Sequence, residues 1–289
     1  MDQAEQLRNI IKANSQLPLA RVITVTSGKG GVGKSNTAIN LAVQLQKLGQ
    51  RVVILDADFG LANIEIMFGA IPRHNLSDLI YQGMQMKDII TQGPMDIGFI
   101  SGGSGIAGMA NLNRDSLDYI VMKLRELDEM ADIVIVDTGA GISDAVLEFL
   151  VASGEVLLVT TPEPTSITDS YSLIKALARH PKYSSETTTV KVVANRVRGE
   201  QEAEQLFHKL ETVVDKYLKI PIEYLGMVPQ DEQLASAVMQ QMPVSIENPG
   251  AKSAMAYEQL AAKLMNRETG KVQPRRGMAA FFTHIISRR

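Results

Sequence analysis

Runs of apolar, mostly β-branched residues recur along this chain, and stretches of helical periodicity lie between them. Most runs are apolar throughout rather than alternating, which is typical of strands buried on both faces of a parallel sheet. Strands are expected at residues 21–27, 51–58, 96–101, 131–138, 155–162, 188–197 and, more weakly, 222–228. Helices are expected at Ser35–Leu48, Arg114–Met130, Ser166–Ala178, Glu200–Tyr217 and Ala251–Met265. This alternation predicts an α/β fold with a doubly wound, mainly parallel sheet.

Two segments lie outside the alternation, so the chain divides into four parts. We expect an N-terminal helix and lead-in at residues 1–20, one domain at 21–265, a linker at 266–276 and a terminal helix at 277–289. The 289 residues include no cysteine, which excludes disulfides, zinc–thiolate sites, iron–sulfur clusters and thiol catalysis. The net charge of −3 does not favour nucleic-acid binding. No signal peptide or bilayer-spanning run is visible, so a cytoplasmic protein is expected.

The clearest chemical motif, SGKGGVGKSN at residues 27–36, follows the first expected strand. It fits G-x-x-x-x-G-K-[ST], in which glycines let backbone amides face phosphate oxygens. Lys34 would add positive charge at the β- and γ-phosphates, and Ser35 would offer its hydroxyl to Mg²⁺. The expected phosphate cradle comprises Gly28, Lys29, Gly30, Gly31, Val32, Gly33, Lys34, Ser35 and Asn36.

A dinucleotide-binding loop is the competing interpretation of the same glycines. Gly28, Gly30 and Gly33 also fit G-x-G-x-x-G, and Asp56 follows near the end of the second expected strand. A dinucleotide loop has no use for the Lys34–Ser35 pair, because backbone and water hold its pyrophosphate. The strand–loop–helix setting therefore favours ATP or ADP with Mg²⁺ as the cofactors.

Carboxylates at the ends of two other expected strands complete the candidate site. Asp137, in IVIVDTGAG, would meet Mg²⁺ through water, and Asp58, in LDADFGLAN, would orient the attacking water close to the metal. Asp56 is either a second catalytic carboxylate or a structural one, and its position alone does not decide between them. Lys29 is not needed for cradling phosphate in cis, and an isolated loop lysine is usually only solvated charge.

At these residues the sequence resembles the deviant Walker A ATPases of the MinD/ParA (SIMIBI) group, through KGGVGKS (29–35), DADFGLAN (56–63) and VDTGAG (136–141). The resemblance covers residues 20–265 and implies a face-to-face homodimer around two ATP molecules. It implies that Lys29 contacts the partner subunit's phosphates in trans. It also implies that Asn195 and Pro229 form the adenine pocket, and that Glu163 and Asp169 lie near the dimer interface.

The N-terminal extension makes the flagellar-number regulators of the group (FlhG, YlxH or FleN) the most similar branch. DQAEQLR, at residues 2–8, is similar to the segment through which these proteins stimulate the FlhF GTPase, so the resemblance implies contacts from Gln3, Ala4 and Leu7. It also implies flagellar C-ring proteins as partners. The alternative is a helix that packs on the chain's own domain, or a frayed terminus.

The C-terminal segment GMAAFFTHIISRR has the pattern of a short amphipathic helix. One apolar stripe comprises Met278, Phe281, Phe282, Ile285 and Ile286. Flanking arginines could meet anionic headgroups, so we expect a helix that lies in the membrane interface, weakly by itself and more strongly in a dimer. Docking of the same stripe on the chain's own surface is the alternative, expected for the ATP-free state.

These observations predict an ATPase switch that dimerises with ATP and associates reversibly with the inner face of the cell membrane. By resemblance, it would regulate flagellar number and placement. Two alternatives stay open: a MinD-like ATPase that positions the division site, and a metabolic P-loop enzyme such as a kinase or a dethiobiotin-synthetase-like ligase, in which Lys29 would act in cis.

Overall fold

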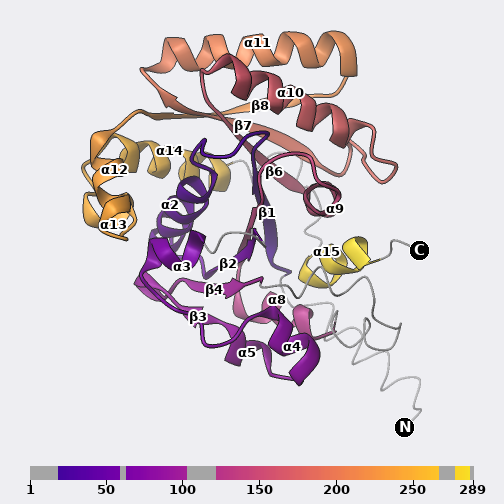
Figure 1. The fold of residues 1–289 in the computed structure, drawn as a ribbon, viewed down its shortest axis with the longest axis vertical. Helices are drawn as coiled ribbons and strands as arrows, with labels where there is room; N and C mark the ends of the chain where they lie inside the picture. The colour runs from indigo at the N-terminus through magenta and orange to yellow at the C-terminus, as the bar shows by residue number, and fades with distance from the viewer. Residues whose placement is uncertain (1–18, 59–62, 103–121, 267–276, 287–289) are drawn as a thin grey trace.

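The central feature of the computed structural model is an eight-stranded sheet with helices on both faces (Figure 1). The structure describes residues 19–58, 63–102, 122–266 and 277–286. The strands are β1 (Arg21–Thr26), β2 (Val52–Ala57), β3 (Thr91–Gln92), β4 (Gly98–Ser101), β5 (Ile133–Thr138), β6 (Glu155–Thr160), β7 (Thr189–Val197) and β8 (Ile222–Pro229). Their order is β3-β4-β2-β5-β1-β6-β7-β8, and every pairing except β3 with β4 is parallel.

Helices cover the sheet in two layers. They are α2 (Lys34–Lys47), α3 (Asn63–Phe68), α4 (Leu76–Gln82), α5 (Met86–Ile89), the 3₁₀ turn η1 (Pro94–Asp96), α8 (Leu127–Met130), α9 (Asp144–Ala152), α10 (Pro164–Ala178), α11 (Glu200–Leu218), α12 (Glu232–Met239), α13 (Val244–Glu247), α14 (Lys252–Asn266) and α15 (Gly277–Ile286). No helix in these described ranges is both long enough and apolar enough to cross a bilayer.

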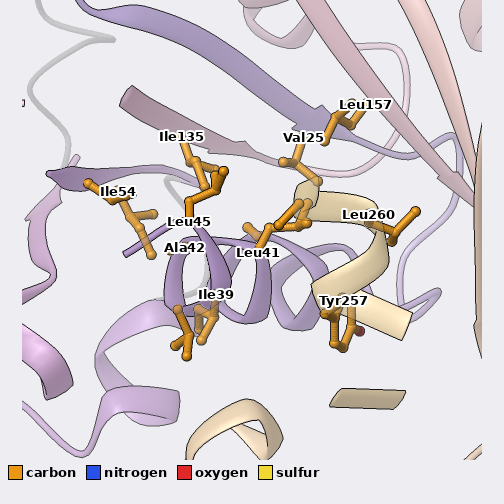
Figure 2. Packing of buried hydrophobic residues seen from close by; sticks show 14 of the residues in the cluster. Val25, Ile39, Leu41, Ala42, Leu45, Ile54, Ile135, Leu157, Tyr257 and Leu260 are labelled. Atoms are coloured by element: carbon orange, nitrogen blue, oxygen red, sulfur yellow. The ribbon is translucent and has the colours of Figure 1, made fainter. Parts of the chain in front are cut away.

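Successive residues of the strands point to opposite faces of the sheet, where they pack in separate cores. On one face, Ile23 and Val25 of β1 pack with α2 and α14, as Figure 2 shows for Leu41 and Leu260. On the other face, Val22 packs in a core that includes residues of α4, α5, α8, α9 and α15, while α10 and α11 cover the β6–β7 side. Burial on both faces is the reason that the strands are apolar throughout, as expected.

The seven expected strands and four of the five expected helices are confirmed, with ends that differ by at most two residues. The fifth helix, expected at Arg114–Met130, lies partly outside the described residues and ends at Met130 as expected. Short elements were missed: β3 has two residues, and α3, α5 and α13 have four to six. Such lengths do not develop a periodic pattern.

Candidate functional site

The loop between β1 and α2 forms a cradle of backbone amides at the carboxyl ends of the strands. Gly31 (φ 76°) and Gly33 (φ 93°) have left-handed backbones that only glycine adopts without strain. A Cβ added to Gly30 or Gly31 would meet no atom within 4 Å, so this side of the loop is open. The amides of Gly30, Gly31 and Gly33 donate to no acceptor in the part of the chain that is described. Free amides at a helix N-terminus are suited to phosphate oxygens.

Lys34 and Asp137 form the buried centre of the site. Lys34 Nζ donates to Asp137 Oδ1 at 2.7 Å and to Ser35 Oγ at 3.3 Å. Asp137 lies at the end of β5, where burial raises the pKa of its carboxyl while the Lys34 ammonium opposes that rise. Its other oxygen, Oδ2, is buried without a hydrogen-bond partner among the described residues. An unpartnered carboxylate oxygen beside a serine hydroxyl fits the outer shell of a hydrated Mg²⁺.

Asp58 and Asp56 lie beside this centre with different environments. Asp58 follows β2, and Asn63 Nδ2 donates to its Oδ2 at 3.5 Å. Asp56 is buried in β2, pairs in register with Asp137, and accepts from Asp58 N at 3.1 Å. Burial, together with the Asp137 charge, raises the pKa of Asp56 to about 7. Asp56 thus braces the turn that presents Asp58, which favours the structural interpretation of Asp56.

Lys29 bonds to residues outside the loop to which it belongs. Its Nζ donates to Glu163 Oε2 at 2.7 Å and to Thr165 Oγ1 at 3.0 Å, at the start of α10. This ammonium lowers the pKa of the Glu163 carboxyl. The sequence interpretation placed Glu163 near Lys29 only through the dimer interface and missed Thr165, because no local pattern links the loop to α10.

Asp169 is brought to the loop by its backbone. A Cβ on Gly28 would lie 2.3 Å from the carbonyl carbon and oxygen of Asp169, so Gly28 permits the close approach of α10. The loop at Gly28 therefore packs directly against α10 at Asp169, one of the two residues expected near the dimer interface.

Of the two residues expected at the adenine pocket, Asn195 lies against the loop and Pro229 pairs with Val197. Asn195 Nδ2 donates to the carbonyl of Val32 at 2.7 Å, and Asn195 Oδ1 accepts from Arg196 N at 2.9 Å. Pro229 ends β8, and the following Gln230 N donates to Val197 O at 2.9 Å. Asn195 thus contacts the cradle with its amide bonded to backbone, whereas the contacts of Pro229 are with β7.

The described side chains of the α15 stripe face the protein, and the side chain of Ile286 lies outside the part of the structure that is described. Met278, Phe281 and Phe282 are fully buried, and the Phe281 ring stacks on Phe149 of α9 at 5.9 Å between centroids. Ile285 is half-buried at the margin. The structure thus has the docked arrangement that was expected for the ATP-free state. Gln3, Ala4 and Leu7 lie outside the described residues.

Polar contacts hold both ends of α15. Asp128 Oδ1 accepts from Met278 N at 2.8 Å and from Ala20 N at 3.2 Å, and Lys182 Nζ donates to His284 O at 2.9 Å. A carboxylate at the start of a helix and an ammonium at its end both complement the helix dipole. Neither anchor was found from the sequence, because each joins segments more than 100 positions apart.

Together these residues fit a nucleoside triphosphate with Mg²⁺. The loop amides, Lys34 and Ser35 would hold the phosphates and the metal, and Asp137 and Asp58 would hold the metal's waters and the attacking water. The metal would neutralise phosphate charge when bound.

Comparison with known proteins agrees with this geometry. Residues 23–244 match the CobQ/CobB/MinD/ParA nucleotide binding domain. Antiactivator FleN of Pseudomonas aeruginosa is 39% identical over 84% of this chain and 86% of that protein. Flagellum site-determining protein YlxH of Helicobacter pylori is 30% identical over 99% of this chain and 98% of that protein.

Solved structures share the fold. The Pyrococcus furiosus cell division ATPase MinD superposes with a TM-score of 0.65 at 22% identity, over 86% of this chain and 99% of that one. Septum site-determining MinD from Pyrococcus horikoshii, a complex with Mg-ADP, has a TM-score of 0.65 at 20% identity, over 88% of this chain and 100% of that one. The phosphate cradle, its carboxylates and these similarities together make the chain an ATPase of the MinD/ParA group within the CobQ/CobB/MinD/ParA nucleotide-binding family.

Proposed function

We propose that the chain is a flagellar switch that dimerises when it binds Mg-ATP and separates after hydrolysis. The names of the two similar relatives, an antiactivator and a flagellum site-determining protein, support the flagellar assignment. Its output would be a change of partners and of membrane association that sets the number and placement of flagella. C-ring proteins and an FlhF-type GTPase are the proposed partners.

The direction of Lys29 is the observation that carries this proposal. Lys34 fills the cradle of its own subunit, whereas Lys29 is bound to Glu163 and Thr165 outside it. Its side chain is 37% exposed, so it can reach a second subunit. A metabolic P-loop enzyme would need Lys29 in cis, and this arrangement does not support that role.

Dimerisation is tested with Asp58→Ala, which should bind ATP but hydrolyse it slowly. Size-exclusion chromatography with light scattering should give a dimer with Mg-ATP and a monomer with Mg-ADP. Lys29→Ala in the Asp58→Ala background should stay monomeric with ATP although it still binds it. A monomeric Asp58→Ala at saturating ATP would contradict the switch.

Membrane association is proposed to follow from release of α15. Two helices presented by one dimer would bind a lipid surface far more strongly than one, because binding of the second is intramolecular. In sedimentation with anionic liposomes, we expect most of the protein to bind the liposomes with ATP and less to bind with ADP. Deletion of residues 277–289 should abolish binding with either nucleotide.

Phe282→Glu and Thr283→Glu form a matched pair for the lipid contact. Phe282 is on the buried stripe, whereas Thr283 is exposed on the opposite side of the helix. We expect Phe282→Glu to abolish sedimentation without loss of ATP-dependent dimers, and Thr283→Glu to retain most of it. Equal loss in both variants would mean that the stripe is not the lipid contact.

The N-terminal segment is proposed to stimulate the GTPase partner. A peptide of residues 1–20 should accelerate GTP hydrolysis by an FlhF-type protein, and the same peptide with Gln3→Ala should be weaker. An unchanged rate with the unmodified peptide would exclude this role.

A further inference from the structure

Asn195 is held between two backbone groups on opposite sides of its amide. Its Nδ2 donates to Val32 O at 2.7 Å, and its Oδ1 accepts from Arg196 N at 2.9 Å. The side chain is buried, with 1% of the residue exposed. The two bonds fix the orientation of the amide, because an N–H can donate only to Oδ1 and a carbonyl can accept only from Nδ2.

The backbone around Asn195 is shaped to make this bond. The register between β7 and β8 shifts between Asn195 and Val197, and the intervening Arg196 has φ 57°. A bulge of this kind re-aims the neighbouring side chain and is common beside active sites. Here it turns Arg196 N onto the Asn195 amide and directs Nδ2 at the loop.

The loop is shaped to receive it. β7 lies two strands from β1, with β6 between them. The loop that follows β1 therefore crosses the edge of the sheet, and Val32 reaches Asn195. Gly33 leaves room for the amide, since a Cβ there would lie 2.3 Å from Asn195 Nδ2. Val32 is itself buried, so the bond is shielded from water.

We propose that Asn195 is a positioning residue for the phosphate cradle: its bond to Val32 O holds the amides of the loop in place, so that Asn195 acts on phosphate binding through the loop. The inference rests on the nucleotide site proposed above. It differs from a contact with the base alone in one measurable respect, since a ligand without a base should also depend on Asn195.

Asn195→Asp tests the clamp, because it puts a carboxylate oxygen against the Val32 carbonyl in the same volume. Calorimetry would measure Mg-ATP, Mg-GTP and inorganic tripolyphosphate. We expect affinity for tripolyphosphate to fall about tenfold or more, and affinity for ATP to fall at least as much. Hydrogen exchange of residues 29–34 in the nucleotide-free protein should also become faster.

A loss confined to ATP, with a collapsed ATP-to-GTP ratio and unchanged tripolyphosphate binding, would overturn the clamp and leave Asn195 as a base contact. Wild-type protein that binds neither ATP nor tripolyphosphate would instead refute the nucleotide site itself. If Asn195→Asp does not fold, Asn195→Ala removes the bond without the added charge and should give the same pattern with a smaller loss.

Asn40→Asp is the matched control for a buried asparagine outside the loop. Asn40 is fully buried, donates to Asn36 O at 2.9 Å and accepts from Ser245 N at 2.9 Å. The same substitution there should lower thermal stability but leave the exchange of residues 29–34 unchanged. Equal acceleration of that exchange in both variants would mean that general destabilisation, not the clamp, explains the result.

Discussion

Replacement of Asp128 by alanine should release α15 from the body of the protein. Asp128 Oδ1 is the shared acceptor of Ala20 N and Met278 N, and only 4% of the residue is exposed. Asp128→Ala leaves two donors without an acceptor, at about 1–3 kcal/mol each while they stay buried. Gly277 tolerates no side chain here, since a Cβ would lie 2.8 Å from Asp128 Oδ2.

Detachment limits this cost, because the amides of a released helix are hydrated. The docked helix buries three side chains completely, worth about 1.5–3 kcal/mol each. A penalty of roughly 2–6 kcal/mol is comparable with that gain, so we expect α15 to open while the sheet stays folded. The corresponding acceleration of exchange in α15 is between about 30-fold and 10⁴-fold.

Hydrogen exchange followed by mass spectrometry of the 277–286 peptide measures this effect. Asp128→Asn keeps an oxygen acceptor and should leave exchange close to that of wild type. Asp132→Ala is the surface control, since it removes an exposed pair with Arg51. Exchange of the peptide within twofold of wild type in Asp128→Ala would refute the assignment of Asp128 as the anchor.

The same carboxyl gives the docked helix a pH dependence. Burial raises the pKa of Asp128 above its ordinary value, against the opposing effect of the bonds from Met278 and Ala20. A raised pKa in the docked state means that docking strengthens as pH falls through that value and weakens as pH rises through it. Asp128→Asn should remove this dependence from the exchange rate of α15, and a pH profile that persists in the variant would assign it to another group.

Three further predictions concern other ion pairs. Lys34→Ala should abolish ATP binding by calorimetry and destabilise the fold by about 3–5 kcal/mol in urea, because Asp137 is left as an unpaired buried charge. Glu163→Gln should raise the fraction of ATP-dependent dimer about two- to fivefold by freeing Lys29 from an exposed pair, and a lower fraction would contradict this. Glu155→Gln should lower the free energy of unfolding by about 3 kcal/mol at pH 7. This difference from wild type should shrink as pH falls below 4.5, because the cationic partners of Glu155 hold its pKa below that ordinary value.

Much of the fold and of the phosphate site could be predicted because the signals are local. Most of the seven expected strands are apolar runs, and the loop from Gly28 to Ser35 is a short segment between a strand and a helix. A parallel sheet also brings the ends of its strands to one edge, which is how Asp58 and Asp137 could be placed near Lys34 without coordinates.

What could not be predicted depends on contacts between distant segments. The partners of Lys29 lie on α10, the partner of Asn195 is a backbone carbonyl, and Asp128 is an acidic residue in an unremarkable helical stretch, LDEM. Nothing in the periodicity of α15 could say whether its stripe faces lipid or protein, since both offer an apolar surface to the same side chains.

Both lysines of the loop are paired with carboxylates. Lys34 is bound to Asp137, and Lys29 to Glu163, so a triphosphate must compete with a carboxylate for each ammonium. Asp137 is the penultimate residue of β5, and residues 139–143 connect this strand to α9, whose Phe149 stacks on Phe281 of α15. A change in the partner of Lys34 therefore acts at one end of the segment from β5 to α9, against which α15 packs. The exchange assay of α15 measures whether it is transmitted: faster exchange of Asp58→Ala in Mg-ATP than in Mg-ADP would establish the coupling, and equal exchange would exclude it.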